Sequence, residues 1–513
     1  MAVDNTNGFA EFSRMRSAQN KGLGFWGWMA IVLCVYIIFM PAKKQDVTDT
    51  QIAQVEKVDM SSVPRQTISS DKIAATIQGF RISGINLDDY KEKKGEMDNV
   101  ELLSGDDEFV EIGMTIDGKP SMQPKAVTEK VGKDGVLTMS WSPVPGVFVR
   151  RRFVPQAYTI SIFDEIRNGK NKEISVSQNV RLVRNMGEKN RVAVKTGGIS
   201  NVGGSIKRDT FESIGKNSVT YSADKESFIG FSDQYWEVIA APYGLKKNTI
   251  NMAQRSDKMF VADAVTEPIK ILADHTVTIN SAVFAGPKTQ KVLLDASKII
   301  PGIDRTIDYG WFVFLTRPFL WTLNQLHNLI PNYGIAIILL TLLIRGFMWP
   351  LSKKSYESAA KMQKIQPEVR MIQQRYASDK TRLQQEMMML YKRHKVNPFS
   401  SLGVMILQIP IFFALYKTLL IAVPLRQAEF LWLSDLSVMD PYFILPILMA
   451  VTMRMQNRIN RKSGVDVGAK FMKYMPIIFA VLFAWMPSGL VLYWTVSNLV
   501  GVLQMKIMQK DKK

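Results

Sequence analysis

Long apolar runs without charge alternate with polar stretches along this chain, and they gather near the N-terminus and after residue 332. About 20 apolar residues in a helix cross the roughly 30 Å of hydrocarbon in a bilayer. Two of the later runs are short for that thickness, which fits local thinning of the bilayer or a wet cavity. The pattern predicts a multi-pass α-helical membrane protein with six transmembrane helices, at residues 22–41, 333–350, 401–422, 441–456, 471–487 and 488–506.

The first apolar run is predicted to stay in the chain as a signal anchor. It ends in MPA, which lacks the small residues at −3 and −1 that precede a signal-peptidase cut. Leu33 before Cys34 does not fit a lipoprotein box. Basic residues in the segment 1–21 favour a cytoplasmic N-terminus.

The region between the first and second apolar runs has the pattern of a β-rich soluble domain. Short alternating or β-branched runs are separated by Gly, Asn and Asp; examples are FVEIGMTI, GVLTMSWS, YTISIF and TVTINSAVFA. This spacing is typical of a sandwich of antiparallel strands. We therefore predict an inserted all-β sandwich domain at residues 42–305, with a polar tether up to about residue 70 and a helix around LLDASKII at its end.

Residues 306–332 are predicted to form an amphipathic helix in the outer membrane–water interface. Their apolar side chains recur at helical spacing, at Trp311, Phe312, Leu315, Phe319, Leu323 and Leu326. An apolar stripe of this kind lies in the plane of the interface rather than across the bilayer.

Charge sets the predicted orientation. Residues 351–400 are too charged to enter the bilayer and have the pattern of a helical hairpin broken near Asp379. The stretch 353–395 holds 11 basic and 4 acidic residues, and residues 454–473 hold 6 and 1. By the positive-inside rule these segments are cytoplasmic. The predicted cytoplasmic parts are thus the segments 1–21, 351–400, 457–470 and 507–513, and the periplasmic parts are the β domain and the loop 423–440.

Composition agrees with a chain that is part membrane-embedded and part soluble. It is 47% hydrophobic with a mean hydropathy of −0.01, and Cys34 is the sole cysteine, which excludes an internal disulfide framework. The net charge of +19 does not indicate nucleic-acid binding. Residues 42–308 hold 37 basic and 35 acidic residues, a net of +2, so the excess lies in the predicted cytoplasmic segments.

The sequence offers little for catalysis. His275, His327 and His394 fall in different predicted compartments, and no metal, nucleotide or nucleophile motif is present. For His327 the plain interpretation is a polar residue at the interface. We therefore expect no enzymatic activity, no cofactor, no metal and no small-molecule substrate. The predicted spans also hold no carboxylate, which counts against a proton- or cation-coupled carrier.

Arg345 is the unusual residue of the predicted spans. An arginine at membrane depth costs roughly 2.5 to 3.5 kcal/mol on insertion scales, so it needs a partner or an exit to water. It could snorkel to the cytoplasmic edge, which Pro350 and Lys353 mark. Alternatively it could converge with other polar residues in a hydrated, positively charged groove that opens inward. The candidates are Thr341, Gln408, Thr495, Ser497 and Asn498, for which helix packing is the alternative.

Several motifs after residue 308 resemble the YidC membrane protein insertases. They are TLLIRGFMWPLSK, QEMMMLYKRHKVNP, ILQIPIFFALY, DLSVMDPYFILPILM and FAWMPSGLVLYWTVSNLV, in that order. The domain between the first two spans resembles the large periplasmic domain of the Gram-negative form through its position, length and β content.

The resemblance implies a function in the bacterial inner membrane. In the family, the arginine that matches Arg345 attracts acidic residues in the outer tail of an incoming protein, whose apolar segment then slides into lipid. Thr341 matches a groove position, and Tyr493 and Trp494 match an aromatic pair whose second member contacts substrate and is often tyrosine. The implied partners are nascent membrane proteins, the Sec translocon, and ribosomes and the signal recognition particle pathway through the basic cytoplasmic loops.

Two other functions are compatible with parts of the pattern. A membrane channel or carrier would predict paired inverted repeats or intramembrane acids, and neither is visible. A membrane-anchored envelope-binding protein would place its function in the β domain and tolerate changes at Arg345. The predicted substrate groove of an insertase consists of Arg345, Thr341, Gln408, Tyr493, Trp494, Ser497 and Asn498.

Overall fold

The computed structural model describes residues 63–510, except 96, 105–106, 122–127, 133–134, 186–196, 224–226, 244–246, 257, 397–399 and 462–468. The predicted signal anchor and most of the predicted tether lie outside the described residues. The chain divides into two compact units. One is β-rich and comprises Asp46–Tyr309 with Leu420–Gln427, and the other is helical and includes Gly310–Leu419 and Ala428–Lys513.

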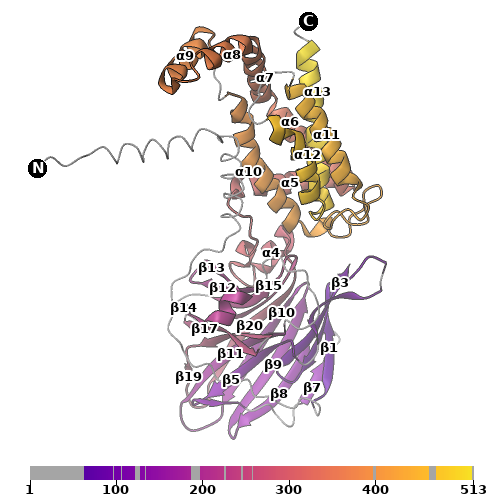
Figure 1. Ribbon diagram of the computed structural model, residues 1–513. Coiled ribbons are helices and arrows are strands. Elements are labelled where there is room, and N and C mark those ends of the chain that lie inside the picture. Colours follow the sequence, from indigo (N-terminus) through magenta and orange to yellow (C-terminus); the bar gives the residue numbers. More distant parts are fainter. Residues whose placement is uncertain are drawn as a thin grey trace, which may run out of the picture. The chain divides into compact units, whose positions relative to one another are not determined.

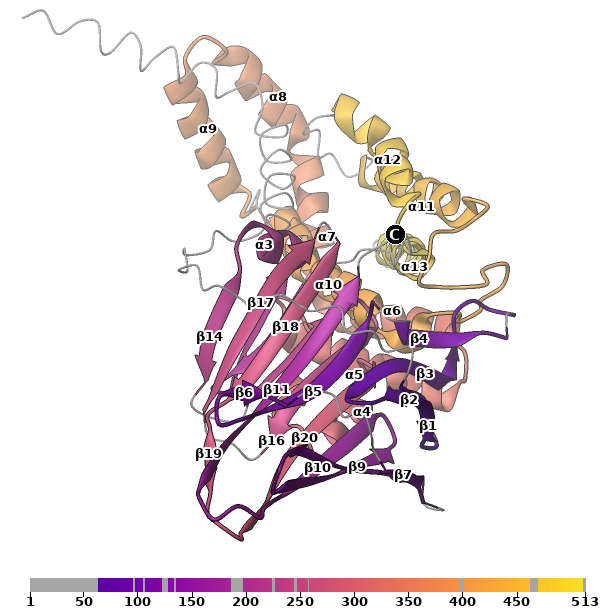
Figure 2. The same ribbon diagram turned by 90° about the horizontal axis from the view of Figure 1, so that it is seen from below.

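The β-rich unit is a sandwich of two antiparallel sheets (Figure 1). The first sheet has eleven strands, which Figure 2 shows side by side along most of its width. In spatial order they are β1 (Arg65–Ser69), β2 (Ile73–Gln78), β3 (Arg81–Lys91), β5 (Phe109–Ile116), β11 (Ile174–Asn185), β18 (Met259–Thr266), β17 (Asn248–Ser256) and β14 (Val219–Ala223), with β4 (Asn99–Ser104), β6 (Lys119–Pro120) and β19 (Ile269–Ile271) paired beside β3, β5 and β11.

The second sheet has nine strands and, like the first, ends in short edge strands. In spatial order they are β13 (Ser205–Thr210), β12 (Gly197–Val202), β15 (Phe228–Ser232), β16 (Trp236–Tyr243), β20 (Thr276–Pro287), β10 (Thr159–Asn168), β9 (Val147–Gln156), β8 (Leu137–Val144) and β7 (Thr128–Val131). A short helix, α3 (Phe211–Lys216), follows β13. The predicted β-sandwich is confirmed, because alternate side chains along the strands are buried between the two sheets.

Arg151 is the largest fully buried side chain of this sandwich. Its Nε and Nη2 donate to the two carboxylate oxygens of Asp164, the residue opposite it on β10, at 2.6 and 2.9 Å. Its Nη1 donates to the carbonyl of Ile112 on β5 at 2.6 Å. Since β9 and β5 belong to different sheets, the guanidinium ties the two sheets together inside the core.

The C-terminal end of the β-rich unit folds back onto β16. Two short elements follow the last strand, α4 (Gln290–Ala296) and the 3-10 turn η2 (Ile303–Arg305). Thr306 after this turn is buried, and its Oγ1 lies 2.8 Å from Oε1 of the buried Glu237. Residues 420–427, which contain the turn η3 (Val423–Leu425), are counted with this unit.

The helical unit consists of nine helices among the described residues. They are α5 (Val313–Leu329), α6 (Tyr333–Phe347), α7 (Trp349–Lys364), α8 (Gln366–Arg375), α9 (Lys380–Arg393), α10 (Ser400–Ile421), α11 (Ile444–Arg461), α12 (Ala469–Phe483) and α13 (Ser488–Lys510). Helix α13 packs against α6 and α11, and α11 also packs against α12. On α5 and the residues before it, Trp311, Phe314 and Trp321 are exposed, which fits an amphipathic helix at an interface.

The predicted span 333–350 is interrupted in the structure. Helix α6 ends at Phe347, and α7 continues at an angle of 55° to it. Pro350 explains the break, because proline has no N–H for the helical ladder and disfavours helical geometry in the residue before it. Helix α7 therefore belongs to the segment predicted as a hairpin.

The hairpin itself has a small core of its own. Ile365, Val369, Leu390 and Val396 are buried together between α8 and α9. Asp379 lies between these helices and accepts a hydrogen bond from the Arg382 N–H, which caps α9. Asp379 thus marks the start of α9, after α8 has ended at Arg375, and the sequence predicted a break near this residue.

Length and apolarity identify fewer spans than the sequence predicts. Among the described residues, one helical segment, Ser488–Met508, is long and apolar enough to cross a membrane. The bent pair Tyr333–Phe347 and Trp349–Met362 passes the same test when taken together, whereas Leu407–Ile421 and Tyr474–Phe483 are shorter apolar helices. Helix α11 carries three arginines, and α12 has 15 residues, fewer than the about 20 that cross the hydrocarbon. The count of six spans stays a prediction.

Candidate functional site

Arg345 lies in the last turn of α6 and points toward α13. The rest of α6 is apolar except for Tyr333 and Thr341, and Asn332 caps its N-terminus. The Nε of Arg345 donates to Oγ of the buried Ser497 on α13 at 2.8 Å. In the part of the chain that the structure describes, the guanidinium has no carboxylate partner, and its Nη1 and Nη2 make no hydrogen bond. The interpretation of Arg345 as a residue with a polar partner is therefore favoured over simple snorkelling.

A second polar contact joins α10 to α13. Gln408 Nε2 donates to the hydroxyl oxygen of the buried Tyr493 at 2.9 Å. Tyr493 and Ser497 are four residues apart, so both lie on one face of α13. The structure thus brings four of the predicted residues together, from three helices. We refer to Arg345, Gln408, Tyr493 and Ser497 as the polar cluster.

Asn498 lies beside this cluster in sequence but is not paired within the described structure. It is 5% exposed, and its Nδ2 has no hydrogen-bond partner among the described residues. A buried amide donor without a partner costs about 1–3 kcal/mol. The unpaired Nδ2 of Asn498 therefore favours binding of water or of a polar group of another molecule at this position.

Thr341 does not join the polar cluster. Its side chain is fully buried, and its hydroxyl donates to the carbonyl of Ile337 in its own helix at 2.7 Å. The hydroxyl of Thr495 likewise bonds to Val491, one turn earlier in α13. Sequence spacing placed Thr341 on the face of Arg345, but a threonine in a helix can satisfy its hydroxyl on its own backbone. The helix-packing alternative describes both threonines.

Trp494 presents an aromatic surface next to the polar cluster. Its ring centroid lies 5.1 Å from that of Phe412 on α10 and 5.3 and 6.0 Å from those of Phe483 and Phe479 on α12. Such distances are typical of interacting aromatic pairs. Because Tyr493 faces Gln408 while Trp494 faces these phenylalanines, consecutive residues of α13 separate a polar side from an apolar one.

Three residues near Arg345 were not predicted from the sequence. Gln504 Nε2 donates to the main-chain carbonyl of Arg345 at 3.2 Å. Gly501 lies between Ser497 and Gln504 on α13, and a Cβ built there would be 3.1 Å from Gln456 Nε2 and 3.8 Å from Arg345 Nη1. The available signal was spacing, since positions 497, 501 and 504 follow one another at helical intervals of four and three.

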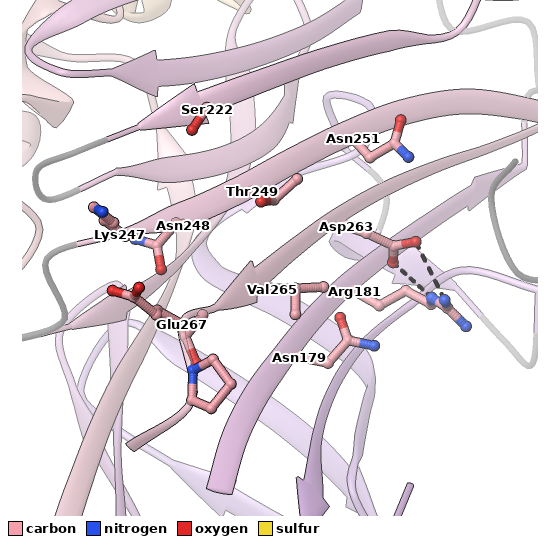
Figure 3. Close-up of a pocket in the computed structure, with 12 residues that line it drawn as sticks. Asn179, Arg181, Ser222, Lys247, Asn248, Thr249, Asn251, Asp263, Val265 and Glu267 are labelled. Atoms are coloured by element: carbon pink, nitrogen blue, oxygen red, sulfur yellow. Dashed lines mark hydrogen bonds and ion pairs between the residues drawn. The ribbon is translucent and has the colours of Figure 1, made fainter. Parts of the chain in front are cut away.

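The β-rich unit has a shallow polar pocket on the face of its eleven-stranded sheet (Figure 3). Its volume is about 580 Å³, and it is lined by side chains of β11, β14, β17 and β18. Arg181 Nε and Nη2 donate to the two oxygens of Asp263 at 2.6 and 3.2 Å, as the dashed lines in Figure 3 mark. Lys247 and Glu267 lie at its other end. The charges of Arg181 and Asp263 thus neutralise each other within the protein.

Two family descriptions match the chain. Residues 325–513 match the family described as 60Kd inner membrane protein, and residues 65–322 match the YidC periplasmic domain. Both helical and β-rich units are thereby covered.

Individual relatives cover nearly the same span. A protein of Methylobacillus flagellatus named membrane protein insertase YidC is 30% identical over 498 residues, which are 90% of this chain and 89% of the relative. A protein of Francisella philomiragia with the same name is 32% identical over 473 residues, 88% of this chain and 85% of the relative. A crystal structure described as an active YidC insertase with its first transmembrane domain resolved aligns with 93% of this chain and 97% of its own, at a TM-score of 0.38 and 19% identity.

Proposed function

This chain belongs to the YidC family of membrane protein insertases, and we propose that Arg345 and its neighbours form the groove in which it receives a substrate. The protein is a membrane insertase of the inner membrane, and its substrates are nascent membrane proteins. The main support for the proposal is the hydrogen bonding of the Arg345 guanidinium. Ser497 holds its Nε, while Nη1 and Nη2 bond to no described residue and are left for an incoming anion.

The polar step of insertion rests on this guanidinium. A carboxylate in the outer tail of a substrate accepts hydrogen bonds from Nη1 and Nη2, and a charge-assisted pair of this kind is stronger than a neutral one. The pair has to be transient, because the tail must move on across the membrane. A potential that is positive outside adds about 2.3 kcal/mol per 100 mV for each negative charge moved outward.

The apolar step rests on the other side of α13. Trp494 with Phe412 and Phe483 forms an aromatic surface from three helices, along which an apolar segment slides into lipid. Burial of roughly 20 apolar residues in the bilayer supplies the driving force, so the mechanism needs no nucleotide and no catalytic residue. The protein has only to lower the barrier for the polar tail.

The proposal also includes the membrane topology and the partners of the protein. Six spans with both termini in the cytoplasm place the β-sandwich in the periplasm and the hairpin of α8 and α9 in the cytoplasm. The basic stretch 353–395 then faces ribosomes and the signal recognition particle pathway. Long charged tails exceed what one arginine can accommodate, and for these the protein works beside the Sec translocon.

Replacement of Arg345 tests the polar step. Arg345→Ala should slow insertion of a small substrate with an acidic outer tail about tenfold in reconstituted vesicles, the effect of losing roughly 1.4 kcal/mol of a charge-assisted contact. Arg345→Lys keeps the charge and serves as the matched control, and a substrate with a neutral tail should insert at the wild-type rate. A wild-type rate for the acidic-tailed substrate in Arg345→Ala, or the same fractional loss for both substrates, would refute the role of the arginine.

Site-specific crosslinking tests the apolar step. A photo-crosslinker in place of Trp494 should capture nascent chains, because the native ring is partly exposed among the aromatic side chains of α10 and α12. The same crosslinker in place of Leu499, which is exposed on another face of α13, is the control and should capture lipid instead. Capture at Leu499 without capture at Trp494 would put the substrate path elsewhere.

A further inference from the structure

Gln504 is a buried polar residue two turns beyond Ser497 on α13. It is 5% exposed, and its Nε2 donates at 3.2 Å to a main-chain atom of another helix, the carbonyl oxygen of Arg345. Burial of an amide side chain is unfavourable unless it is hydrogen-bonded. The contact therefore compensates a real cost and holds α13 against the end of α6.

The Arg345 carbonyl lies where the backbone needs an external tie. It belongs to the last four residues of α6, whose carbonyls run out of regular helical partners. Directly after it, Met348 closes the turn onto Gly346 and Ile344, and the chain bends by 55° into α7. A helix end at such a bend is free to rotate or fray unless another element fixes it.

Helix α13 fixes Arg345 at two points. Ser497 holds the Nε of its side chain and Gln504 holds its main chain. Gly501 lies between them, and a Cβ there would press on Gln456 Nε2 at 3.1 Å while meeting Arg345 Nη1 only at 3.8 Å, an ordinary van der Waals distance. We call these three positions, Ser497, Gly501 and Gln504, the arginine seat.

We infer that Gln504 is a positioning residue, which sets the rotation and depth of the last turn of α6 so that Arg345 presents Nη1 and Nη2 to the substrate carboxylate. This inference rests on the proposed function of Arg345. Gln504 does not itself touch substrate. Five bonds separate the Cα of Arg345 from its guanidinium carbon, so a small shift of the last turn of α6 becomes a larger shift of the guanidinium. Loss of the hydrogen bond from Gln504 therefore misplaces the charge without removing it.

The test combines Gln504→Met with two substrates that differ only in the outer tail. Methionine keeps the length and volume of glutamine but donates no hydrogen bond. We expect the acidic-tailed substrate to insert roughly three- to tenfold more slowly, as for the loss of one hydrogen bond, and the neutral-tailed substrate to insert at the wild-type rate. In an Arg345→Ala background, Gln504→Met should cause no further loss, because it acts through the arginine.

Two further variants keep the test independent of folding. Thr452→Val on α11 removes another buried hydrogen-bond donor, a hydroxyl that bonds only within its own helix, and should leave both substrates unaffected. Gly501→Ala crowds the Gln456 side chain and meets Arg345 only at 3.8 Å, so it should leave the preference between the two substrates as in the wild type.

The outcomes separate this inference from the proposed function. If Arg345→Ala slows the acidic-tailed substrate but Gln504→Met does not, the positioning role of Gln504 is wrong and the role of Arg345 stands. If Gln504→Met slows both substrates alike, or adds to the Arg345→Ala defect, Gln504 has a merely structural role and the inference is overturned. If Arg345→Ala changes the insertion rate of neither substrate, the proposed function of the arginine is wrong, and the role of Gln504 falls with it.

Discussion

Replacement of Glu237 by glutamine should remove a pH dependence from the stability of the β-rich unit. Glu237 is 1% exposed on β16, and burial, the largest effect, raises the pKa of its carboxyl to about 7, although Lys288, Thr306 and Arg208 oppose the shift. Thr306 Oγ1 lies 2.7 Å from the carbonyl of Ile303 as well as 2.8 Å from Glu237. Thr306 is the donor in both contacts, and because a hydroxyl has one proton, the Ile303 carbonyl competes with the Glu237 carboxyl for it.

The size and sign of the effect follow from linkage. The ordinary pKa of 4.5 applies to the unfolded chain, so between pH 4.5 and about 7 the folded state holds a proton that the unfolded state has lost. The contribution of this group to stability is therefore fully present below pH 4.5 and is lost as pH rises through about 7. The difference of about 2.5 units corresponds to roughly 3 kcal/mol.

Hydrogen–deuterium exchange on the full-length protein in detergent measures this directly. Peptides from β16 and its neighbour β20 should exchange faster in the wild type at pH 8 than in Glu237→Gln, after correction for intrinsic exchange, and the two proteins should converge near pH 4.5. Other acidic groups titrate in both proteins, so the difference isolates Glu237. A difference that stays constant across this range would refute the argument that Glu237 is protonated in the fold.

Three further changes should act as follows. Arg151→Met should destabilise the β-rich unit by about 3–5 kcal/mol in chemical unfolding, because it strands the buried carboxylate of Asp164, and adding Asp164→Leu should recover most of the loss. Asp379→Ala should cost the hairpin about 1 kcal/mol and expose α9 to protease at its N-terminus, whereas Asp379→Ser should not. Removal of residues 65–287 should leave much of the insertion activity in vesicles, since the polar cluster and Trp494 lie in the helical unit; complete loss at normal membrane levels would contradict this.

Strand β9 shows why the β-sandwich was predictable and its core only partly so. The run FVRRRFV has the spacing typical of a strand, with three arginines in its middle. In the structure the period of two prevails over residue type, since Arg151 is buried with Val149 and Phe153, while Phe148 is exposed. Alternation alone indicates the inward position of Arg151, but the partner that makes its burial tolerable, Asp164, is set by cross-strand register.

The candidate site, too, was predictable from the sequence only in part. Residue type and depth in an apolar run were enough to select Arg345, Gln408 and Ser497, because polar groups at membrane depth need polar neighbours, whereas Tyr493 was selected through the family resemblance. These properties could not distinguish Thr341, whose hydroxyl is satisfied within its own helix. Gln504 was overlooked because it lies close to the basic end of its run, where a polar residue is expected to face water.

What a single sequence lacks is the crossing of α6 and α13. Both helices could be located from apolar runs, but which turn of one meets which turn of the other depends on packing along their whole length. That crossing brings Ser497 to the side chain of Arg345 and Gln504 to its carbonyl, and it places Gly501 beside Gln456 and Arg345. An arginine at membrane depth is therefore a signal of function that sequence can supply, whereas the groups that aim it are a property of the helix interface.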